Sequence, residues 1–254
     1  MITATTRLVA LLGHPVAGSL SARMQNAAFA ARALDWAYVA LDVEAAALPA
    51  AVTGLQALGF AGANVTIPHK GAVVELCDEL DDLARRSGAV NTLVLREGRI
   101  RGANTDGPAV AATVEATGAH VLVLGRGGAA RSAAVALEEA GAASVRLASR
   151  ADEGWPPDGE DATILVNATP LRDEVSVAPR ADQQVVDLAY RPDGRPTALV
   201  EAARAAGCAT VVDGLEILVR QGAASFELWT GVAAPTDVMR AAVGRGRGSL
   251  PGSD

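Results

Sequence analysis

The stretch 120-HVLVLGRGGAARSAAVAL-137 decides the fold class, because an apolar run passes through a glycine-rich turn into a helical pattern. The run 120–125 is apolar without alternation, which predicts a strand in a parallel sheet covered on both faces. A helix is expected to follow from Ala129 to Ala140. A strand, a glycine turn and a helix in this order are typical of a dinucleotide-binding unit.

The turn 125-GRGGAAR-131 fits the pattern G-x-G-x-x-A. Gly125 permits the tight turn, Gly127 lets the backbone approach a pyrophosphate, and Ala130 allows the helix to pack closely on the sheet. The helix N-terminus then offers free N–H groups to the anion. A glycine-rich turn without a ligand is the alternative interpretation, and the flanking strand and helix favour the nucleotide site.

The next strand, expected over 144–149, ends where the cofactor is selected. Arg150 follows it directly, and an arginine at this place suits a 2′-phosphate, so NADP is expected. Asp152 and Glu153 come next and would repel a phosphate that they faced, so NAD stays open as the alternative.

The connection after Arg150 is short. Only residues 151–162 precede the following strand, expected over 163–168. A parallel crossover usually contains a helix, but Pro156 and Pro157 would break one here. We therefore predict a trimmed nucleotide-binding domain whose second crossover is an extended loop.

Outward from this unit, strand-like and helix-like segments alternate, which predicts an α/β fold. Further strands are expected at 7–12, 36–43, 62–67, 184–189 and 209–214, a hairpin at 89–105, and helices at 21–34, 47–58, 70–86 in two pieces, 197–206, 215–229 and from about 235 onward. The pattern restarts near Thr105 to Gly107, which predicts a boundary between two α/β units, with the chain end folding back on the first.

A second stretch, 61-AGANVTIPHKGAV-73, ends a β-branched run at Pro68 and places Lys70 just after it. One interpretation is that Lys70 merely opens a surface helix. The other is that the end of the strand aims an amine into a cleft, where Pro68 fixes the backbone before it.

The composition restricts the class of function. The chain has 254 residues, half of them hydrophobic, and a formal net charge of −7, which argues against a general nucleic-acid binder. No apolar run reaches the roughly 18 residues needed to cross a bilayer. No secretory signal is recognised either, so a cytoplasmic protein without a membrane partner is expected.

The two cysteines, Cys77 and Cys208, have neither metal-ligand spacing nor a disulfide pattern. Both are interpreted as small core residues, and no metal site is expected. The only basic run, Arg245 to Gly248, is interpreted as part of a frayed tail.

Over nearly its whole length the chain resembles the shikimate dehydrogenases. The resemblance rests on eight motifs in family order: GHPVAGSLS at 13–21, GANVTIPHK at 62–70, GAVNT at 88–92, NTDG at 104–107, GRGGAAR at 125–131, NATPL at 167–171, DLAYRPDGRPT at 187–197 and DGLEILVRQGAASFELWTG at 213–231. It implies a substrate domain (1–106 plus 215–254) beside a Rossmann-like NADP domain (107–214), with the C-terminal helices on the former. The implied reaction interconverts 3-dehydroshikimate and shikimate with NADP(H).

The resemblance also implies roles for single residues. Lys70 matches the family's catalytic lysine and Asp106 its partner. The matching substrate-binding positions are Ser19, Ser21, Thr66, Asn91, Tyr190 and Gln221, and the matching cofactor-binding positions are Gly125, Arg126, Gly127, Gly128, Ala129, Ser149, Arg150, Thr169, Gly214 and Leu218. Taken singly, the serines could cap a helix, Asn91 could be a turn residue and Gln221 a surface residue.

The chain also departs from the family pattern. Gly18 and Ala22 replace the usual histidine and proline around the serines, and Ser149 and Ala151 weaken the polar clamp for a 2′-phosphate. Arg172 stands where a glycine is usual. These changes leave open a related enzyme acting on quinate or an amino analogue of shikimate, and a binding protein without activity. A monomer or a homodimer is expected.

Overall fold

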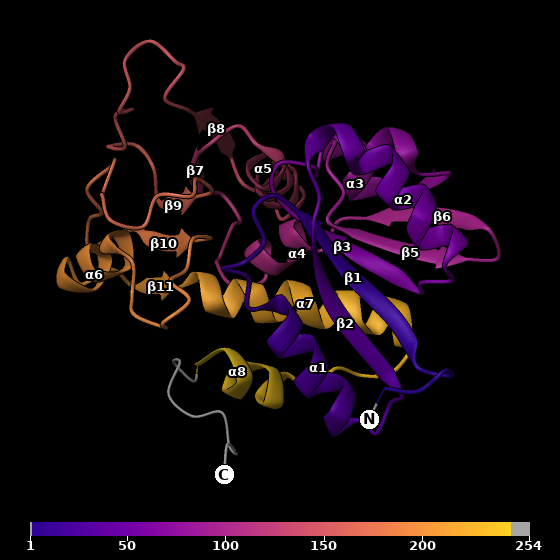
Figure 1. Ribbon diagram of the computed structural model, residues 1–254. Coiled ribbons are helices and arrows are strands. Elements are labelled where there is room, and N and C mark those ends of the chain that lie inside the picture. Colours follow the sequence, from indigo (N-terminus) through magenta and orange to yellow (C-terminus); the bar gives the residue numbers. More distant parts are fainter. Residues whose placement is uncertain (1, 245–254) are drawn as a thin grey trace.

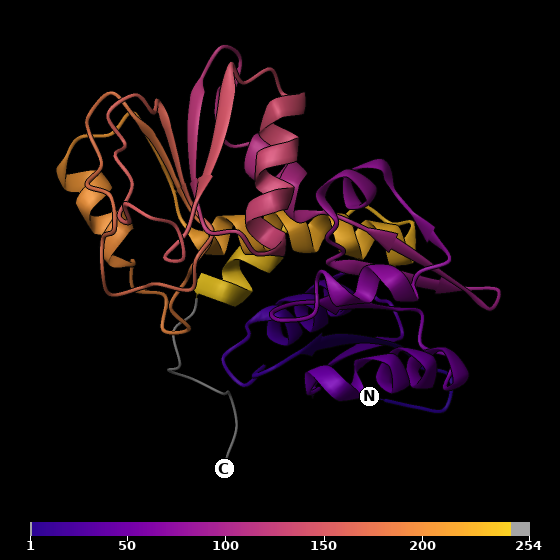
Figure 2. The same cartoon turned by 90° about the horizontal axis from the view of Figure 1, so that it is seen from above.

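The computed structural model describes residues 2–244, which form two α/β units side by side (Figure 1). Each unit is built on its own sheet, and a long helix, α7 (Gly214–Thr230), runs along both. Seen from above, the two units stand apart at their outer ends and converge over this helix (Figure 2). The tail 245–254, with its expected basic run, lies outside the described residues.

The first sheet has six strands in the order β2-β1-β3-β5-β6-β4. These strands are β1 (Arg7–Gly13), β2 (Trp36–Asp42), β3 (Gly62–Val65), β4 (Glu79–Leu80), β5 (Thr92–Arg96) and β6 (Arg99–Ala103). β1 pairs in parallel with β2 and β3, whereas β5 is antiparallel to β3 and to β6. The expected hairpin is therefore confirmed, and Glu97 and Gly98 turn it with positive φ values of 54° and 73°.

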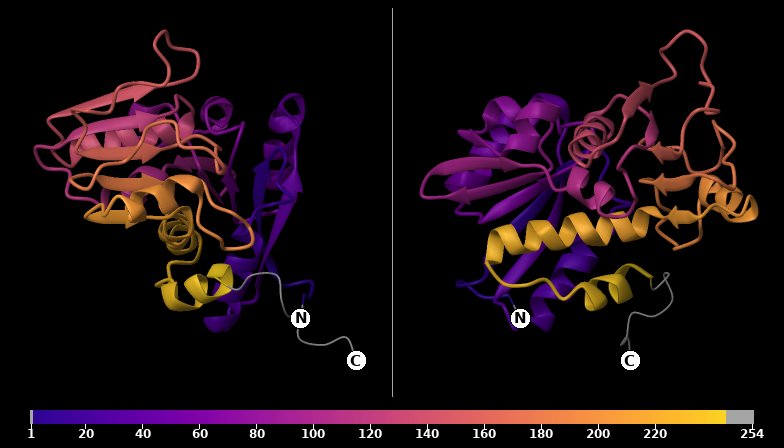
Figure 3. Two further views of the ribbon diagram at one scale, coloured as in Figure 1. Left: turned by 90° about the vertical axis from the view of Figure 1, so that its left-hand side faces the viewer. Right: turned by 180° about the vertical axis from the view of Figure 1, so that it is seen from behind.

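Both faces of this sheet are covered, because successive residues of a strand point to opposite sides. Val9 and Leu11 pack with the aromatic side chains of α1 (Ser21–Ala31) and α7, together with α8 (Thr236–Gly244). Ala10 and Leu12 pack on the other side against α2 (Leu48–Ala57). The view from behind shows α7 and α8 along one side of the molecule (Figure 3).

The second sheet has five strands, all parallel, in the order β11-β10-β9-β7-β8. They are β7 (His120–Leu124), β8 (Ser144–Ala148), β9 (Ile164–Asn167), β10 (Gln184–Asp187) and β11 (Thr210–Val212). Val121 and Val123 face α4 (Asp106–Ala111) and α5 (Gly128–Glu139), while Leu122 and Leu124 face α6 (Ala198–Ala205). The continuous apolar run is thus explained by two covered faces, as predicted.

The connection from β8 to β9 contains no helix, which confirms the predicted extended loop. This loop passes over β7, so the connections from β7 to β8 and from β8 to β9 run on opposite faces of the sheet. The strand order reverses at β7, and in open α/β sheets ligands bind at such a switch point. Trp155 of this loop packs against the core residues of the α6 face. The loop therefore covers the surface that a crossover helix would otherwise cover.

Several boundaries differ from the predicted ones. β3 ends at Val65, before the expected Ile67, although the Thr66 N–H still donates to Leu12 O at 2.8 Å and Ile67 O still accepts the His14 N–H at 3.0 Å. The segment 70–86 contains a 3₁₀ helix (η2, Ala72–Leu76), the short β4 and α3 (Asp82–Ser87), and the Asp81 carboxylate begins α3 by accepting the Ala84 N–H at 2.7 Å.

The remaining expectations on the fold need smaller corrections. α1 ends at Ala31 instead of residue 34, because the chain turns through Ala33 with a φ of 51°. Cys77 and Cys208 are free thiols, half-buried at the margin of the cores instead of inside them. Within residues 2–244, no helix combines the length and the apolar character needed to cross a membrane.

Candidate active site

Lys70 and Asp106 form an ion pair between the turn after β3 and the first residue of α4. The Lys70 Nζ lies 2.7 Å from Asp106 Oδ2, and the two side chains are only 15% and 9% exposed. Lys70 does not open a helix, because η2 begins at Ala72. The interpretation of Lys70 as a solvated helix start is therefore wrong, and its amine lies in a largely enclosed polar site.

Asn91 fixes the carboxylate of this pair from the other side. Its Nδ2 donates to Asp106 Oδ1 at 2.9 Å and to Thr105 Oγ1 at 2.8 Å. Its Oδ1 accepts the Thr105 N–H at 2.8 Å, which sets the orientation of the amide. Asn91 is 2% exposed, so it acts as a buried strut and not as a surface turn residue.

The helix α7 closes the same site. Gln221 Oε1 lies 3.4 Å from Asn91 Nδ2, and Gln221 Nε2 donates to Leu218 O at 2.8 Å. Gln221 is half-buried, so it is not an ordinary surface residue of a helix. A segment more than a hundred residues away in the chain thus reaches the ion pair.

A buried polar network connects this pair to the serine turn near α1. Tyr38 donates its hydroxyl proton to Asn64 Oδ1 at 2.9 Å, and Asn64 Nδ2 donates to Ser225 Oγ at 2.9 Å. Ser225 Oγ is 3.3 Å from Thr105 Oγ1, and Thr92 Oγ1 joins the same cluster. The two ends of the substrate unit are therefore held by one continuous set of hydrogen bonds.

Tyr38 joins the network to Ser21, whose side chain is its other hydrogen-bonding partner. Burial raises the pKa of Tyr38 far above its ordinary value, so the phenol stays neutral and keeps its donor. Sequence reasoning missed Tyr38, Asn64, Thr92, Thr105 and Ser225. All but Tyr38 lie within the quoted motifs, which was the available signal.

The serine turn gives α1 no side-chain cap, because the helix begins after Leu20 without one, so the interpretation of the serines as helix caps is wrong. Ser19 Oγ accepts the Ser21 N–H at 3.2 Å, which is a local turn bond at the start of α1. A Cβ added to Gly18 would lie 3.8 Å from Pro192, so the turn faces the loop that follows β10. The turn thus borders the space between the two units.

Two other substrate-side candidates lie near these elements. Thr66 is half-buried, and its methyl group occupies the space next to Gly13, where a Cβ would come within 2.3 Å. Tyr190 packs against the aromatic core beside α7. Both lie on segments that run along the edge between the units.

The glycine turn after β7 has the geometry of an anion site. Gly125 has a φ of 119°, in the region that favours glycine, and its N–H donates to Ala148 O at 2.7 Å. Gly127 precedes α5 with open space around it and gives the helix no side-chain cap. The first N–H groups of α5 are therefore available to a pyrophosphate, so the residues present fit a dinucleotide.

The start of α5 also touches the catalytic candidate. A Cβ added to Gly128 would come within 2.8 Å of Lys70 Cβ, so the helix lies directly against the lysine stem. Ala129 follows it within the first turn. The nucleotide turn and the ion pair are thus neighbours, which brings the expected catalytic and cofactor residues together.

The other cofactor candidates lie at the ends of β9 and β10 or on α7. Thr169 donates its hydroxyl proton to Asn167 Oδ1 at 2.6 Å just after β9. Gly214 begins α7 where a Cβ would meet Ala189 O at 2.3 Å, and Leu218 is 8% exposed one turn later. These positions share the edge of the sheet at which the glycine turn lies.

Arg150, expected near a 2′-phosphate, and Arg126, the cofactor candidate of the glycine turn, are both paired with acids. Arg150 forms an ion pair with Glu174, and Arg126 Nη2 lies 2.8 Å from Asp152 Oδ2. Asp152 also accepts the Ser149 N–H at 2.8 Å. The Arg126 guanidinium, followed by the Ser149 N–H, lowers the pKa of Asp152, so both donors favour its charged carboxylate.

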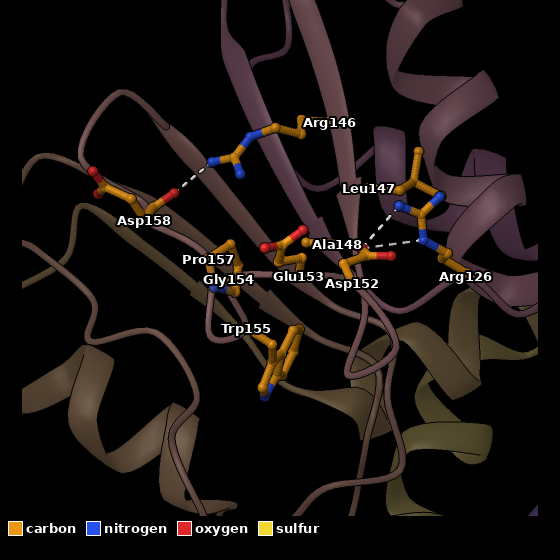
Figure 4. Close-up of a pocket in the computed structure, with 10 residues that line it drawn as sticks. All are labelled: Arg126, Arg146, Leu147, Ala148, Asp152, Glu153, Gly154, Trp155, Pro157 and Asp158. Carbon is orange, nitrogen blue, oxygen red and sulfur yellow. Dashed lines mark hydrogen bonds and ion pairs between the residues drawn. The ribbon is translucent and has the colours of Figure 1, made fainter.

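A cavity of about 430 Å³ lies beside this second pair (Figure 4). Its wall includes Arg126, Asp152, Glu153 and Trp155, and Arg150 is not part of it. Of the two acids expected to repel a phosphate that they faced, Asp152 is paired with Arg126.

Arg131 joins the two units and was not singled out from the sequence. Its Nε donates to Ser87 O at 2.8 Å and its Nη2 to Gly88 O at 2.9 Å, at the C-terminal end of α3. It is the last residue of the quoted GRGGAAR motif, which was the only signal. Among residues 2–244 there is no group of three His, Cys, Asp or Glu side chains placed to hold a metal ion.

Comparisons with known proteins show which family this chain is similar to. Residues 11–93 match the family described as the shikimate dehydrogenase substrate binding domain, and residues 214–243 match the shikimate 5′-dehydrogenase C-terminal domain. A relative from Anaeromyxobacter sp. (strain Fw109-5), named shikimate dehydrogenase (NADP(+)), is 45% identical over 277 residues, covering 96% of this chain and 98% of the relative.

Solved structures are similar over the same extent. A shikimate dehydrogenase in complex with NADP+ has a TM-score of 0.86 at 34% identity and covers 96% of each chain. The shikimate 5-dehydrogenase of Thermus thermophilus, in complex with NADP(H) and shikimate, has a TM-score of 0.79 at 36% identity, covering 93% of this chain and 98% of that one. The resemblance and the fold inferred from the motifs are confirmed.

Proposed function

The chain belongs to the shikimate dehydrogenase family, and on this premise we propose that it catalyses the reversible, NADPH-dependent reduction of 3-dehydroshikimate to shikimate. The observation that carries the proposal is the Lys70–Asp106 ion pair at 2.7 Å, held by Asn91 and lying against the start of α5. This arrangement joins a proton donor to a site that fits a dinucleotide.

Lys70 is proposed as the general acid and base. NADPH, when bound, supplies a hydride to the keto carbon. The carbonyl oxygen then needs a proton, which the Lys70 ammonium donates, and in the reverse direction the neutral amine accepts the hydroxyl proton. One Lys70 N–H is used by Asp106, so two remain for a substrate oxygen.

The composition of the chain supports this role for Lys70. It is the only lysine among 22 basic residues, and all the others are arginines. A guanidinium stays protonated throughout the working range of an enzyme, whereas an amine can release and recover a proton. The position that needs proton transfer is thus the single position at which the chain has an amine side chain.

The remaining polar groups are proposed to bind the substrate. Ser19 and Ser21 bind the carboxylate, Tyr190 lies on the substrate side, and Thr66, Asn91, Asp106 and Gln221 contact ring hydroxyls. The network through Tyr38 and Asn64 supports this assignment, because it joins the serine end to the lysine end by buried hydrogen bonds. A rigid spacing between the two ends favours a ring of one size.

The cofactor is proposed to lie along the edge of the second sheet. The turn from Gly125 to Ala129 binds the pyrophosphate, while Thr169, Gly214 and Leu218 border the nicotinamide. Arg126, Ser149 and Arg150 are proposed for the 2′-phosphate. We also propose the domain division 1–106 plus 215–254 and 107–214, a cytoplasmic location, and a monomeric or homodimeric state.

Steady-state oxidation of shikimate and of quinate, each with NADP and with NAD, tests the proposal. Turnover of shikimate with NADP supports it. Turnover of quinate alone would instead assign a sister activity and direct attention to the Gly18–Ala22 turn. Binding of shikimate without turnover in any combination would favour a binding protein, and would contradict the role of Lys70.

A further inference from the structure

At the cavity beside Arg126, several hydrogen-bond donors surround the carboxylate of Asp152. Asp152 Oδ2 accepts from Arg126 Nε at 3.2 Å, from Arg126 Nη2 at 2.8 Å and from the Ser149 N–H at 2.8 Å. In Figure 4 the Arg126 guanidinium reaches across the cavity wall to this carboxylate. Three donors thus converge on a single oxygen.

These donors are of the kind that a phosphate uses. A guanidinium presents two N–H groups in one plane, which matches carboxylate and phosphate oxygens equally well. A backbone N–H at the end of a strand adds a third, fixed donor. The site therefore selects an oxyanion and not a carboxylate in particular.

The position of the site relates it to the cofactor. Arg126 follows Gly125, the first glycine of the nucleotide turn, and Ser149 follows the last residue of β8. In dinucleotide-binding sheets the ribose 2′ position lies at the end of this second strand, where a cation accommodates the 2′-phosphate of NADP and an acid binds the 2′-hydroxyl of NAD. Here the cation and the acid are bound to each other.

We propose that the Asp152 carboxylate occupies the place of the cofactor 2′-phosphate, so that NADP(H) must displace it from Arg126 to bind. The inference rests on the proposed NADP-dependent activity. Asp152 is then the residue that sets the cofactor preference, because it competes with a phosphate but accepts a hydrogen bond from a ribose hydroxyl.

The other arginine of this region does not relieve the competition. Arg150 is paired with Glu174 and does not line the cavity. The short β8–β9 loop carries Asp152, and its second prolyl residue, Pro157, also lines the cavity wall. Both arginines near the proposed 2′-phosphate site therefore already have acidic partners. The preference for NADP over NAD should then be weaker than it would be with two unpaired arginines.

The test compares two nucleotides that differ in the 2′-phosphate. Isothermal titration calorimetry measures the affinity of the full-length protein for adenosine 2′,5′-bisphosphate and for adenosine 5′-monophosphate. Asp152→Asn removes the charge and keeps an oxygen for the Ser149 N–H. We expect it to bind the bisphosphate about two- to fivefold more tightly, with the monophosphate changed less than about twofold, as for exposed charge pairs.

Two further variants make the test specific. Glu153→Gln removes the same charge from the neighbouring residue of the same cavity wall, which forms no ion pair with Arg126 in the described part of the chain. An equal gain in bisphosphate affinity in this variant would show that any lost negative charge has the same effect, and would overturn the proposal. Arg126→Gln should weaken bisphosphate binding, and the gain from Asp152→Asn should vanish in that background.

The outcomes separate this inference from the proposed function. Bisphosphate binding that Asp152→Asn leaves unchanged overturns the role of Asp152 alone, whereas turnover of shikimate with NADP still stands. If the wild type and Asp152→Asn each bind the bisphosphate and the monophosphate with equal affinity, the role of Asp152 and the NADP assignment are both overturned. Unfolding temperatures of the variants show that each is folded.

Discussion

Lys70→Ala removes the proposed proton donor and is the sharpest test of the site. General acid–base catalysis contributes about 10²- to 10⁴-fold, and each tenfold loss corresponds to about 1.4 kcal/mol in the barrier. We therefore expect kcat to fall by that factor at saturating shikimate and NADP. Shikimate affinity should weaken by less than about tenfold, the usual contribution of one hydrogen bond.

The same substitution affects the stability of the protein, and the structure allows an estimate. Asp106 is 9% exposed; its Oδ1 keeps Asn91 as a donor after Lys70 is gone, but its Oδ2 loses the Lys70 ammonium. An unsatisfied polar group of this kind costs about 1–3 kcal/mol, which lowers Tm by about 2–12 °C in a chain of this size. Calorimetry of the variant separates this loss from the loss of catalysis.

The assay is NADPH formation followed at saturating substrates, with shikimate binding measured separately by calorimetry. Lys70→Arg is the matched control, because a guanidinium can pair with Asp106 but cannot release a proton. We expect it to restore stability and not kcat. A Lys70→Ala enzyme with kcat within tenfold of the wild type, or an active Lys70→Arg enzyme, would refute the proposed proton transfer.

Gly128→Ala should lower kcat about 10- to 100-fold, because its Cβ would come within 2.8 Å of Lys70 Cβ and displace the lysine stem. Gly127→Ala, with no atom within 4 Å of its Cβ, should raise only the KM for NADP; equal losses of kcat would contradict this difference. On α7, the pKa of Glu216 lies below its ordinary value of 4.5, chiefly because Arg240 of α8 donates a hydrogen bond to it. The pair therefore stabilises the fold above pH 4.5, and this contribution is lost as the pH falls through the pKa of the folded state. Arg240→Gln should therefore reduce the free energy of unfolding by at most about 1 kcal/mol at pH 7 and by less at about pH 3, measured by urea unfolding; an equal loss at both pH values would show that the effect is packing.

The two catalytic candidates were expected because the motifs that contain them, GANVTIPHK and NTDG, resemble those of the family, whereas Lys70 taken alone could equally have opened a surface helix. Lys70 follows the proline that comes after β3, and Asp106 opens α4 just after the hairpin. The extended β8–β9 loop was also predictable, because Pro156 and Pro157 exclude a helix whatever surrounds them. The predicted ends of β3 near residue 67 and of α1 near residue 34 were wrong, because periodicity does not locate the residue at which an element ends.

The sequence by itself determined the order of strands, turns and helices and the types of residue at the site, because periodicity, glycine turns and prolines act over a few neighbouring positions. The tertiary structure alone decided which of these residues meet. Tyr38 bonds to Asn64, Ser225 approaches Thr105, and Arg126 pairs with Asp152. Such pairs are selected by strand order, by the return of α7 and by side-chain rotamers in a packed interior, where a buried polar group must find whichever partner the fold brings within reach.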